Sequence, residues 1–330
     1  MSEQLEKQVS QPEHLLEVRD LKQYFPIHTG WFQNTPLKAV DGVSFTIDAG
    51  ETLGLVGESG CGKSTTGRTV VRLNKPTAGS VTFEGHDLFA KMNRQQNMDL
   101  TQKIQIIYQD PYSSLDPRFT VGRCIEEPLI VHHMGNKEER RARVLQLMHD
   151  VGLREEVYTR YPHEFSGGQR QRIGVARALA LDPKLVVCDE PVSALDVSIQ
   201  AQILNLMREL QRKYQLTYIF ISHNLSVVKH ICDRIAVMYL GNIVEIAPKK
   251  ELFDNPLHPY TKALLGAIPI PDPDIPAMQD MLEGDVPSPI NPPKGCCFHT
   301  RCHGCCKECT AQKPKLVNVG NDHWVACCKV

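Results

Sequence analysis

The segment from Gly57 to Ser64, which reads GESGCGKS, constrains the fold of this chain more than any other. It matches the pattern G-x-x-x-x-G-K-[ST] at every fixed position. Glycines let successive backbone N–H groups turn inward around phosphate oxygens, and a helix that starts after the loop aims its positive end at the same place. A short apolar strand at 51–57 precedes the loop, and a helix is predicted over 64–73. The pattern therefore predicts a nucleotide phosphate site between a strand and a helix.

Residues of this loop have separate expected roles. Lys63 would bind the β- and γ-phosphates, and the Ser64 hydroxyl would ligate Mg²⁺. Cys61 is either a small residue that fits the loop, which we favour, or an oxidisable thiol activated by the helix end. The predicted nucleotide-binding residues of this region are Gly57, Glu58, Ser59, Gly60, Cys61, Gly62, Lys63, Ser64 and Thr65.

Two further patterns point to phosphate chemistry. Asp189 and Glu190 end the apolar strand Leu185–Cys188, where Asp189 is placed to hold Mg²⁺ and Glu190 to polarise an attacking water as general base. An acidic pair like this is more often a solvated turn, but downstream of a phosphate loop phosphoryl transfer is the better interpretation. The stretch Phe165–Gln169, FSGGQ, precedes a helix predicted over 170–181 and forms either a second anion site or an ordinary helix cap.

Composition and charge narrow the class of protein. The 330 residues include 37 Lys and Arg against 38 Asp and Glu. The chain therefore lacks the basic excess typical of nucleic-acid binders. No apolar run reaches the roughly 18 residues of a membrane-spanning helix. The start, Met1 to Leu15, lacks the basic-then-apolar order of a signal peptide. We therefore expect a cytosolic protein, with any membrane supplied by other chains.

The order of elements predicts a buried parallel sheet. Short, nearly continuous apolar runs at 185–188, 218–221 and 235–238 are typical of parallel strands covered on both faces. Val43, Phe45 and Ile47 alternate toward a core. From about 91 to 165 the chain is polar and mostly helical, for example at 137–151.

The last part of the chain has a different composition. Ten of the 22 prolines lie between Pro256 and Pro293, which predicts an extended, irregular tail rather than another packed layer. Eight of the 12 cysteines fall between Cys296 and Cys328. In a reducing cytosol, such a cluster favours a metal or iron–sulfur site over a disulfide framework.

The order of these motifs carries a family resemblance. The series GESGCGKS, Gln109, FSGGQ, VVCDE, SALD and His223 resembles the ATP-binding-cassette (ABC) family throughout. The resemblance implies an α/β fold: a RecA-like P-loop NTPase core with an inserted helical subdomain and a Pro/Cys-rich C-terminal extension. The expected division is a flexible N-terminus at 1–14, an ATPase domain at 15–255 with its helical subdomain at about 110–180, and the extension at 256–330.

The resemblance also implies roles at matching positions. The loop at 166–169 would contact the γ-phosphate of an ATP held by a partner cassette, and His223 would reach the γ-phosphate from within this chain. Gln109 would sense Mg²⁺ and couple to a membrane subunit. Phe25, rather than the adjacent Tyr24, would stack on adenine. The loop Ser193-Ala194-Leu195-Asp196 would cross the dimer interface.

Together these interpretations define the expected site. The catalytic residues are Glu190, His223 and Gln109, and the Mg²⁺ ligands are Ser64, Gln109 and Asp189. The nucleotide contacts outside the phosphate loop are Phe25, Ser166, Gly167, Gly168, Gln169, Asp189 and Asp196.

The tail resembles one branch of the family, the dipeptide and oligopeptide importers. NPLHPYT at 255–261 and PSPINPPKGC at 287–296 carry this resemblance, which is closest to the F-type ATP-binding subunit. It implies a sister D-type ATPase subunit as heterodimer partner, two transmembrane permease subunits and an extracytoplasmic peptide-binding protein. Nucleic acid is not an expected partner. The chain would then sit peripherally at the cytoplasmic face of the cell (inner) membrane.

The branch associates four tail cysteines with a [4Fe–4S] cluster, and they map to Cys296, Cys302, Cys309 and Cys327. Four thiolates on loops also suit Zn²⁺, so zinc is the alternative metal, and free thiols are a third interpretation. The sequence departs from the branch pattern by four additional thiols, which put the ligand assignment in doubt: Cys297, Cys305, Cys306 and Cys328.

Rival functions share much of this pattern. A subunit of the same build could serve nickel, an opine or a glutathione-like peptide, because other subunits select the cargo. A soluble cassette ATPase of DNA repair or translation usually carries two cassettes, a coiled coil or basic extensions, and none of these is visible. A non-hydrolysing partner in an asymmetric dimer is disfavoured by Gln109, Glu190, His223 and the full FSGGQ loop.

Overall fold

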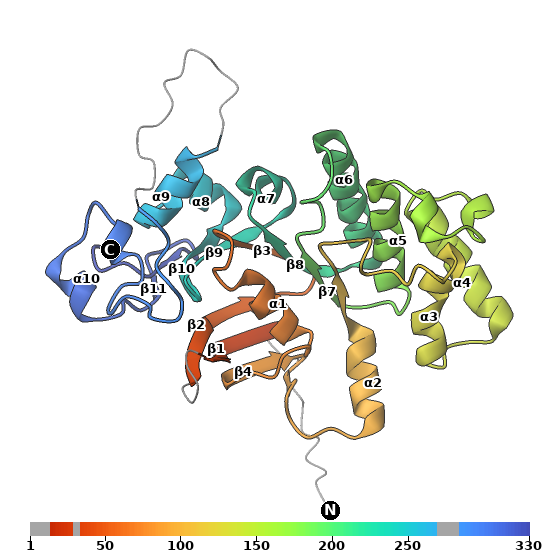
Figure 1. Cartoon of the computed structure of the whole chain (residues 1–330), viewed down its shortest axis with the longest axis horizontal. Coiled ribbons are helices and arrows are strands. Elements are labelled where there is room, and N and C mark those ends of the chain that lie inside the picture. Colours follow the sequence, from red (N-terminus) through yellow and green to blue (C-terminus); the bar gives the residue numbers. More distant parts are fainter. Residues whose placement is uncertain (1–13, 29–33, 269–283) are drawn as a thin grey trace, which may run out of the picture.

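The computed structural model describes residues 14–28, 34–268 and 284–330. The flexible N-terminus predicted at 1–14 therefore lies, except for its last residue, outside the described part. The described chain forms two sheets with helices around them (Figure 1). Within it, no helix is both long enough and apolar enough to span a bilayer.

The larger sheet is mostly parallel and forms the centre of the molecule. Its strand order is β11-β12-β10-β9-β3-β8-β7-β6, and the run from β9 to β6 is parallel. Every residue of β3, β7 and β8 is buried, which confirms the predicted parallel strands covered on both faces. The strands are β3 (Thr52–Val56), β6 (Ile104–Ile107), β7 (Leu185–Asp189), β8 (Thr217–Ser222), β9 (Arg234–Tyr239), β10 (Asn242–Pro248), β11 (Val317–Asn318) and β12 (Trp324–Val325).

The smaller sheet is antiparallel, with the order β2-β1-β4-β5. Its inner face buries Val43, Phe45 and Ile47, as their alternation predicts, in one core with Leu53 and Leu55 of β3. This shared core fixes the strand that leads into the phosphate loop. The strands are β1 (Leu16–His28), β2 (Asn34–Ile47), β4 (Ala78–Phe83) and β5 (His86–Asp87).

Several helices begin at residues whose side chains cap them. Asn136 and Glu139 form a reciprocal capping box at the start of α4, and Thr120 caps α3. The helices are α1 (Lys63–Val70), α2 (Arg94–Lys103), α3 (Val121–Val131), α4 (Lys137–Asp150), α5 (Gly167–Leu179), α6 (Val197–Tyr214), α7 (Leu225–Ile231), α8 (Lys249–Asp254), α9 (Pro259–Gly266) and α10 (Lys307–Ala311). Short 3₁₀ turns lie at Glu155–Val157, Pro162–Glu164 and His299–Arg301.

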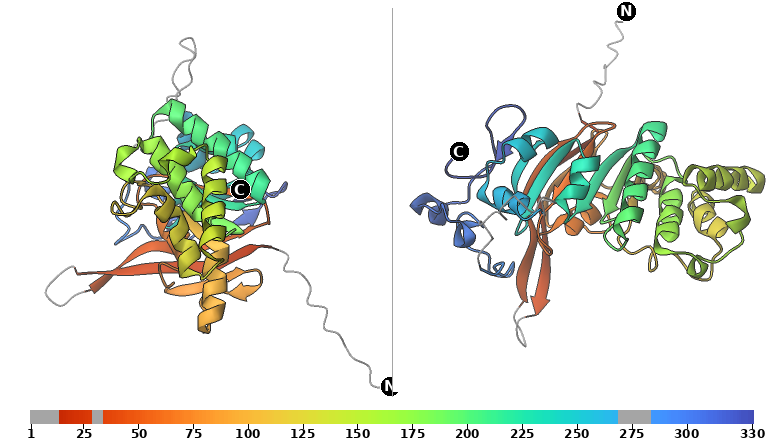
Figure 2. Two further views of the ribbon diagram at one scale, coloured as in Figure 1. Left: turned by 90° about the vertical axis from the view of Figure 1, so that its right-hand side faces the viewer. Right: turned by 90° about the horizontal axis from the view of Figure 1, so that it is seen from above.

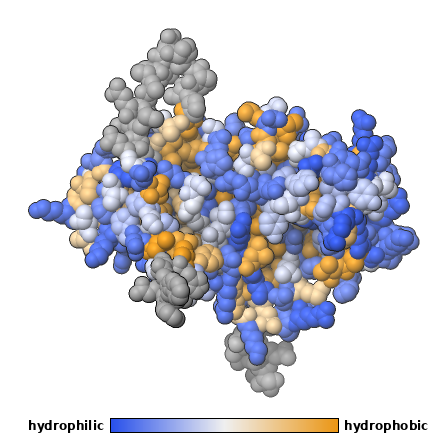
Figure 3. All heavy atoms as spheres, in the orientation of Figure 1, coloured by the Kyte–Doolittle hydropathy of each residue, from blue (hydrophilic) through white to orange (hydrophobic). Residues whose placement is uncertain are grey.

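The helices α3, α4 and α5 pack on one another at one end of the molecule, and the C-terminal segment lies at the other (Figures 1 and 2). Hydrophilic residues cover most of the helical end on the face drawn in Figure 3. The α5 helix also contacts β6 and α6, so it joins this end to the central sheet.

The prediction of an extended, irregular tail is right in part: the described residues 284–330 are mostly irregular, but they pack against the core instead of extending from it. β12 pairs antiparallel with β10 and extends the central sheet, and Phe298 is buried in the main core. The buried Glu245 of β10 accepts hydrogen bonds from the backbone N–H of His258 and from the His323 ring, at 3.1 and 2.7 Å. Buried apolar side chains and pairing with the edge of β10 therefore hold the segment on the core despite its proline content.

Candidate nucleotide-binding site

The phosphate loop connects β3 to α1 in a conformation that requires glycine. Gly57 and Gly62 have φ values of 149° and 104°. A Cβ atom at Gly57 would lie 2.1 Å from the Met238 carbonyl oxygen, and one at Gly62 would lie 2.2 Å from the Ala39 carbonyl oxygen. Strands β9 and β2 thus lie against the loop and leave no room for a side chain at Gly57 or Gly62.

Lys63 is buried at the first position of α1, and its ammonium group folds back over the loop. The Nζ atom donates to the carbonyl oxygens of Gly57 and Glu58, at 2.8 and 2.9 Å. Gly62 is the helix N-cap and, within the described residues, no side chain caps the first turn. The free N–H groups and the ammonium make a positively polarised cradle suited to phosphate.

A carboxylate faces the loop from the end of β7. The Ser64 hydroxyl donates to Asp189 Oδ1 at 2.6 Å, and Asp189 is almost completely buried. A hydroxyl and a carboxylate oxygen are the kind of ligands that Mg²⁺ accepts, so these two residues fit the predicted metal position. Arg68, one helical turn after Ser64, lies 3.5 Å from Asp189 Oδ2. The sequence interpretation missed Arg68, although its i, i+4 spacing from Ser64 places both on one helix face.

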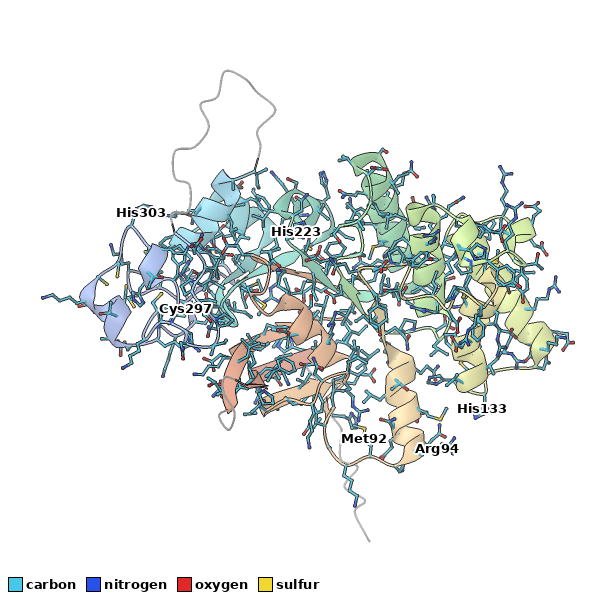
Figure 4. All side chains as sticks on the ribbon, viewed as in Figure 1. Met92, Arg94, His133, His223, Cys297 and His303 are labelled. Atoms are coloured by element: carbon cyan, nitrogen blue, oxygen red, sulfur yellow. The ribbon has the colours of Figure 1, made fainter. Side chains whose placement is uncertain are left out.

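Glu190 brings two other predicted residues together. Its Oε2 atom accepts from Gln109 Nε2 at 3.0 Å and lies 3.2 Å from His223 Nδ1. These side chains come from three places: after β6, after β7 and after β8. His223, labelled in Figure 4, is exposed. Glu190 itself has a φ of 48°, a left-handed conformation that is strained for a residue with a side chain.

Gln109 also borders a hollow between the central sheet and the helical end. This cavity has a volume of about 640 Å³, and its lining includes Arg68, Tyr108, Ser114 and Arg177. The loop that follows β6 therefore borders both Glu190 and the cavity next to the helical end.

The FSGGQ loop forms the start of α5, with Ser166 as N-cap. Gln169 Oε1 accepts from the Ser166 backbone N–H at 3.2 Å, which closes a capping box. A Cβ atom at Gly168 would lie 2.5 Å from Ile199 Cγ2 of α6, and one at Gly167 would lie 3.2 Å from Leu195 Cδ2. The loop is thus held against the predicted interface loop of its own chain.

Ser166, Gly167, Gln169 and Asp196 are exposed. The helices α5 and α1 lie in different parts of the molecule (Figure 1). The structure therefore brings the FSGGQ and SALD loops together within the chain and places them apart from α1.

The aromatic pair of β1 is divided between two environments. The Tyr24 hydroxyl donates to Asp41, and burial together with this carboxylate raises the pKa of Tyr24. Phe25 is half-buried and pairs with Leu37 of β2. Consecutive strand residues point to opposite faces, so the Phe25 ring lies on the face opposite to the Tyr24 hydroxyl. The adenine role of Phe25 remains a prediction.

Cys61 and the tail cysteines differ in their surroundings. Burial raises the pKa of the Cys61 thiol, although Lys63 opposes the effect, and this favours the interpretation as a small, inert residue. In the tail, burial and the neighbouring Cys309, Cys327 and Cys302 raise the pKa of Cys296 to about 11. The four predicted ligands are therefore electrostatic neighbours.

The cysteine cluster is not arranged as a ready metal site. In residues 14–28, 34–268 and 284–330, no group of three or more His, Cys, Asp or Glu side chains could hold a metal ion. Cys306 Sγ lies 3.2 Å from Cys309 Sγ, so an additional thiol occupies the place next to a predicted ligand. Figure 4 shows Cys297 in this region, half-buried with its thiol directed to the Tyr239 carbonyl at 3.8 Å.

Comparisons with known proteins agree with the geometry. The family model described as "ABC transporter" matches residues 40–193, and the model "Oligopeptide/dipeptide transporter, C-terminal region" matches residues 244–309. Oligopeptide transport ATP-binding protein AppF of Bacillus subtilis is 54% identical, covering 96% of this chain and 97% of its own. Oligopeptide transport ATP-binding protein OppF of Salmonella typhimurium is 53% identical, covering 98% of each chain.

Other matches extend the comparison to a dipeptide system and to solved structures. Dipeptide transport ATP-binding protein DppF of Escherichia coli is 52% identical, covering 95% of this chain and 93% of its own. A dimeric ATP-binding cassette in a post-hydrolysis state with ADP and Pi matches with a TM-score of 0.63 and 27% identity, covering 71% of this chain and 98% of that one.

Proposed function

Because the chain belongs to the ABC transporter family, in the branch of oligopeptide and dipeptide transport ATP-binding proteins, we propose that it energises the import of dipeptides or oligopeptides. It is an ATP-hydrolysing subunit with the fold of a P-loop NTPase. The observation that carries the proposal is the convergence of Gln109 and His223 on the Glu190 carboxylate, beside a Ser64–Asp189 pair.

The chain's own residues divide the chemistry of hydrolysis among them. The loop from Gly57 to Thr65 and the Lys63 ammonium hold the phosphates, while Ser64, Asp189 and Gln109 hold Mg²⁺, which neutralises phosphate charge when bound. Glu190 takes the proton of the attacking water. His223, whose Nδ1 lies 3.2 Å from Glu190 Oε2, orients that carboxylate or reaches the γ-phosphate. Phe25 stacks on the adenine.

A second cassette completes the site in this proposal. The exposed Ser166, Gly167 and Gln169, with Gly168 packed beneath them, cover the ATP of a sister D-type subunit, and Asp196 lies at that interface. Two membrane permease subunits and an extracytoplasmic peptide-binding protein complete the transporter, with this chain peripheral to the cytoplasmic face of the inner membrane. The names of the relatives support peptide as cargo over nickel, opines or glutathione-like compounds.

We also propose the division into an ATPase domain at 15–255 and an extension at 256–330. For the extension, we propose that Cys296, Cys302, Cys309 and Cys327 hold a [4Fe–4S] cluster, with Zn²⁺ as the alternative. Four thiols on loops are the donor set that such a cluster uses, which supports this proposal. The additional thiols and the lack of a formed ligand group within the described residues do not support it. Protein purified without oxygen should contain iron and absorb broadly in the visible blue; stoichiometric zinc without iron would overturn the cluster.

The function is tested with the purified complex in proteoliposomes, by ATP-dependent uptake of a labelled peptide. Glu190→Gln should bind ATP but lower turnover by about 10²- to 10⁴-fold, because it lacks the general base. Glu209→Gln, an exposed position on α6, is the matched control and should transport normally. Unchanged turnover in Glu190→Gln would contradict the catalytic assignment, and ATP-driven uptake of nickel instead of peptide would contradict the cargo.

A further inference from the structure

The C-terminal extension reaches the phosphate loop directly, although it follows that loop by some two hundred residues of sequence. Arg301 Nη1 and Nη2 donate to the two carboxylate oxygens of Glu58, at 2.9 and 3.4 Å. The hydroxyl of Tyr260, in the HPY motif, accepts from the Glu58 backbone N–H at 2.9 Å. Glu58 is the second residue of the loop, so both contacts act on the element that holds phosphate.

Both side chains are built into the fold rather than resting on its surface. The Arg301 side chain is 6% exposed, and Tyr260 is completely buried. The Tyr260 ring lies 4.7 Å from that of Tyr239 on β9 and 5.4 Å from that of Phe298, measured between centroids. This aromatic cluster of Tyr239, Tyr260 and Phe298 fixes the extension against the central sheet. The Arg301 guanidinium and the Tyr260 hydroxyl are therefore preorganised to bind Glu58.

Glu58 is consequently held on three sides. Its N–H is bound by Tyr260, its carboxylate by Arg301, and its carbonyl oxygen by Lys63 Nζ at 2.9 Å. The Lys63 ammonium donates to the carbonyl oxygens of Gly57 and Glu58, and it must release or share these hydrogen bonds when it binds phosphate. The position of the ammonium therefore depends on the position of the Glu58 backbone. The guanidinium also neutralises a carboxylate that would otherwise repel a polyanionic nucleotide.

We infer that Arg301 and Tyr260 are positioning residues for the nucleotide phosphates, which act through Glu58 and make the extension a structural part of the ATP site. The inference rests on the proposed ATP site. It gives the HPY motif and the Arg-Cys pair at 301–302 a role in nucleotide binding that does not depend on which metal, if any, the cysteines bind.

The test is equilibrium binding of a fluorescent ATP analogue to the purified full chain, with ATPase kinetics on the complex. Arg301→Gln should weaken ATP affinity about tenfold, which corresponds to 1.4 kcal/mol. The KM for ATP should rise while kcat changes little, because the groups around Glu190 are untouched. Arg301→Lys should lose less, since it keeps the charge but not the two-pronged geometry. Tyr260→Phe should show a smaller loss of the same kind.

A double variant separates positioning from simple loosening of the extension. In Glu58→Gln/Arg301→Gln, compared with both single variants, the two losses of affinity should not add, because Arg301 acts only through the Glu58 carboxylate. Lys307→Gln and Tyr161→Phe, both at exposed positions, are matched controls with unchanged affinity. Thermal unfolding of each variant verifies that it is folded. If Arg301→Gln does not fold, Tyr260→Phe, which removes only one oxygen atom, still tests the inference.

The outcomes are distinguishable from a failure of the proposed function. If the unaltered protein binds and hydrolyses ATP while folded Arg301→Gln and Tyr260→Phe bind it equally well, the positioning role is wrong and the ATPase stands. A double variant whose loss of affinity equals the sum of the losses of Glu58→Gln and Arg301→Gln would also overturn the role, because Arg301 would then act independently of Glu58. Absence of ATP binding in the unaltered protein would instead remove the ATP site itself.

Discussion

Glu190 combines backbone strain with convergent hydrogen bonding. Its φ of 48° aims the carboxylate at Gln109 and His223 instead of along the line of β7. Strain of this kind costs on the order of 1–3 kcal/mol and persists only where the surroundings enforce it. Here the next residues enforce it, because the Ser193 N–H and hydroxyl both donate to the Glu190 carbonyl oxygen, at 3.3 and 3.1 Å.

The phosphate loop offers a test of steric control at a single glycine. Gly57→Ala should abolish ATP binding, because the added Cβ atom would collide with the Met238 carbonyl and push the loop out of shape. Gly50→Ala is the matched control: its φ is also positive, at 82°, but nothing lies within 4 Å of the added atom. It should cost about 1–2 kcal/mol of unfolding free energy and leave ATP affinity intact.

Titration calorimetry with ATP and chemical denaturation of both variants provide the comparison. Equal ATP affinity in the two alanine variants would contradict the steric account of the loop.

At the scale of elements, α4 and α5 both begin with a capping box. Ser166 and Gln169 cap α5, and Asn136 and Glu139 cap α4, each through a reciprocal pair of hydrogen bonds. Loss of either cap by Ser166→Ala or Asn136→Ala should lower the free energy of unfolding by about 1 kcal/mol. Only Ser166→Ala should also lower ATP turnover of the assembled transporter, because only that hydroxyl is proposed to face a nucleotide.

This pair of variants is measured by denaturant unfolding and by ATPase rate. A parallel fall in turnover for Asn136→Ala would show that helix stability, and not phosphate contact, explains the loss.

The start of α9 predicts a dependence of stability on pH. Burial lowers the pKa of His258 to about 4, compared with about 6.5 in the unfolded chain. Because the unfolded chain binds the proton more readily, the contribution is fully present above about pH 6.5 and is lost as pH falls toward 4, by up to about 3 kcal/mol. His258→Asn keeps a side chain able to cap α9 but does not titrate.

Denaturation midpoints between pH 7.5 and 5 test this. The unaltered protein should lose stability more steeply than His258→Asn as the pH falls, and parallel slopes would contradict the role of His258.

At the scale of the whole molecule, local chemistry was predictable from sequence and distant contacts were not. The strand, loop and helix around Gly57–Ser64 follow from glycine conformation and apolar runs, and the parallel strands from their continuous apolarity. The docking of the tail does not, because β11 and β12 are two residues each and carry no periodicity. The proline content correctly indicates irregular backbone there, but it does not reveal that Phe298 and β12 anchor the segment to the core.

The site divides in the same way. Ser64, Asp189, Gln109, Glu190 and His223 were named from motif order, and the structure brings them into two hydrogen-bonded groups. Motif spacing does not predict the contact of Arg301 with the phosphate loop, because its partner Glu58 lies 243 positions away. The extension therefore contacts the phosphate loop, although it follows that loop by some two hundred residues in sequence.

The account as a whole depends on Lys63 and its loop holding nucleotide phosphates. The most direct measurement is ATP affinity of Lys63→Ala, with turnover of the assembled complex, against the exposed control Lys250→Ala at the start of α8. We predict a loss of affinity of at least about tenfold, equivalent to 1.4 kcal/mol, and no turnover in Lys63→Ala, with the control unchanged. Full ATP affinity and turnover in folded Lys63→Ala would contradict the account.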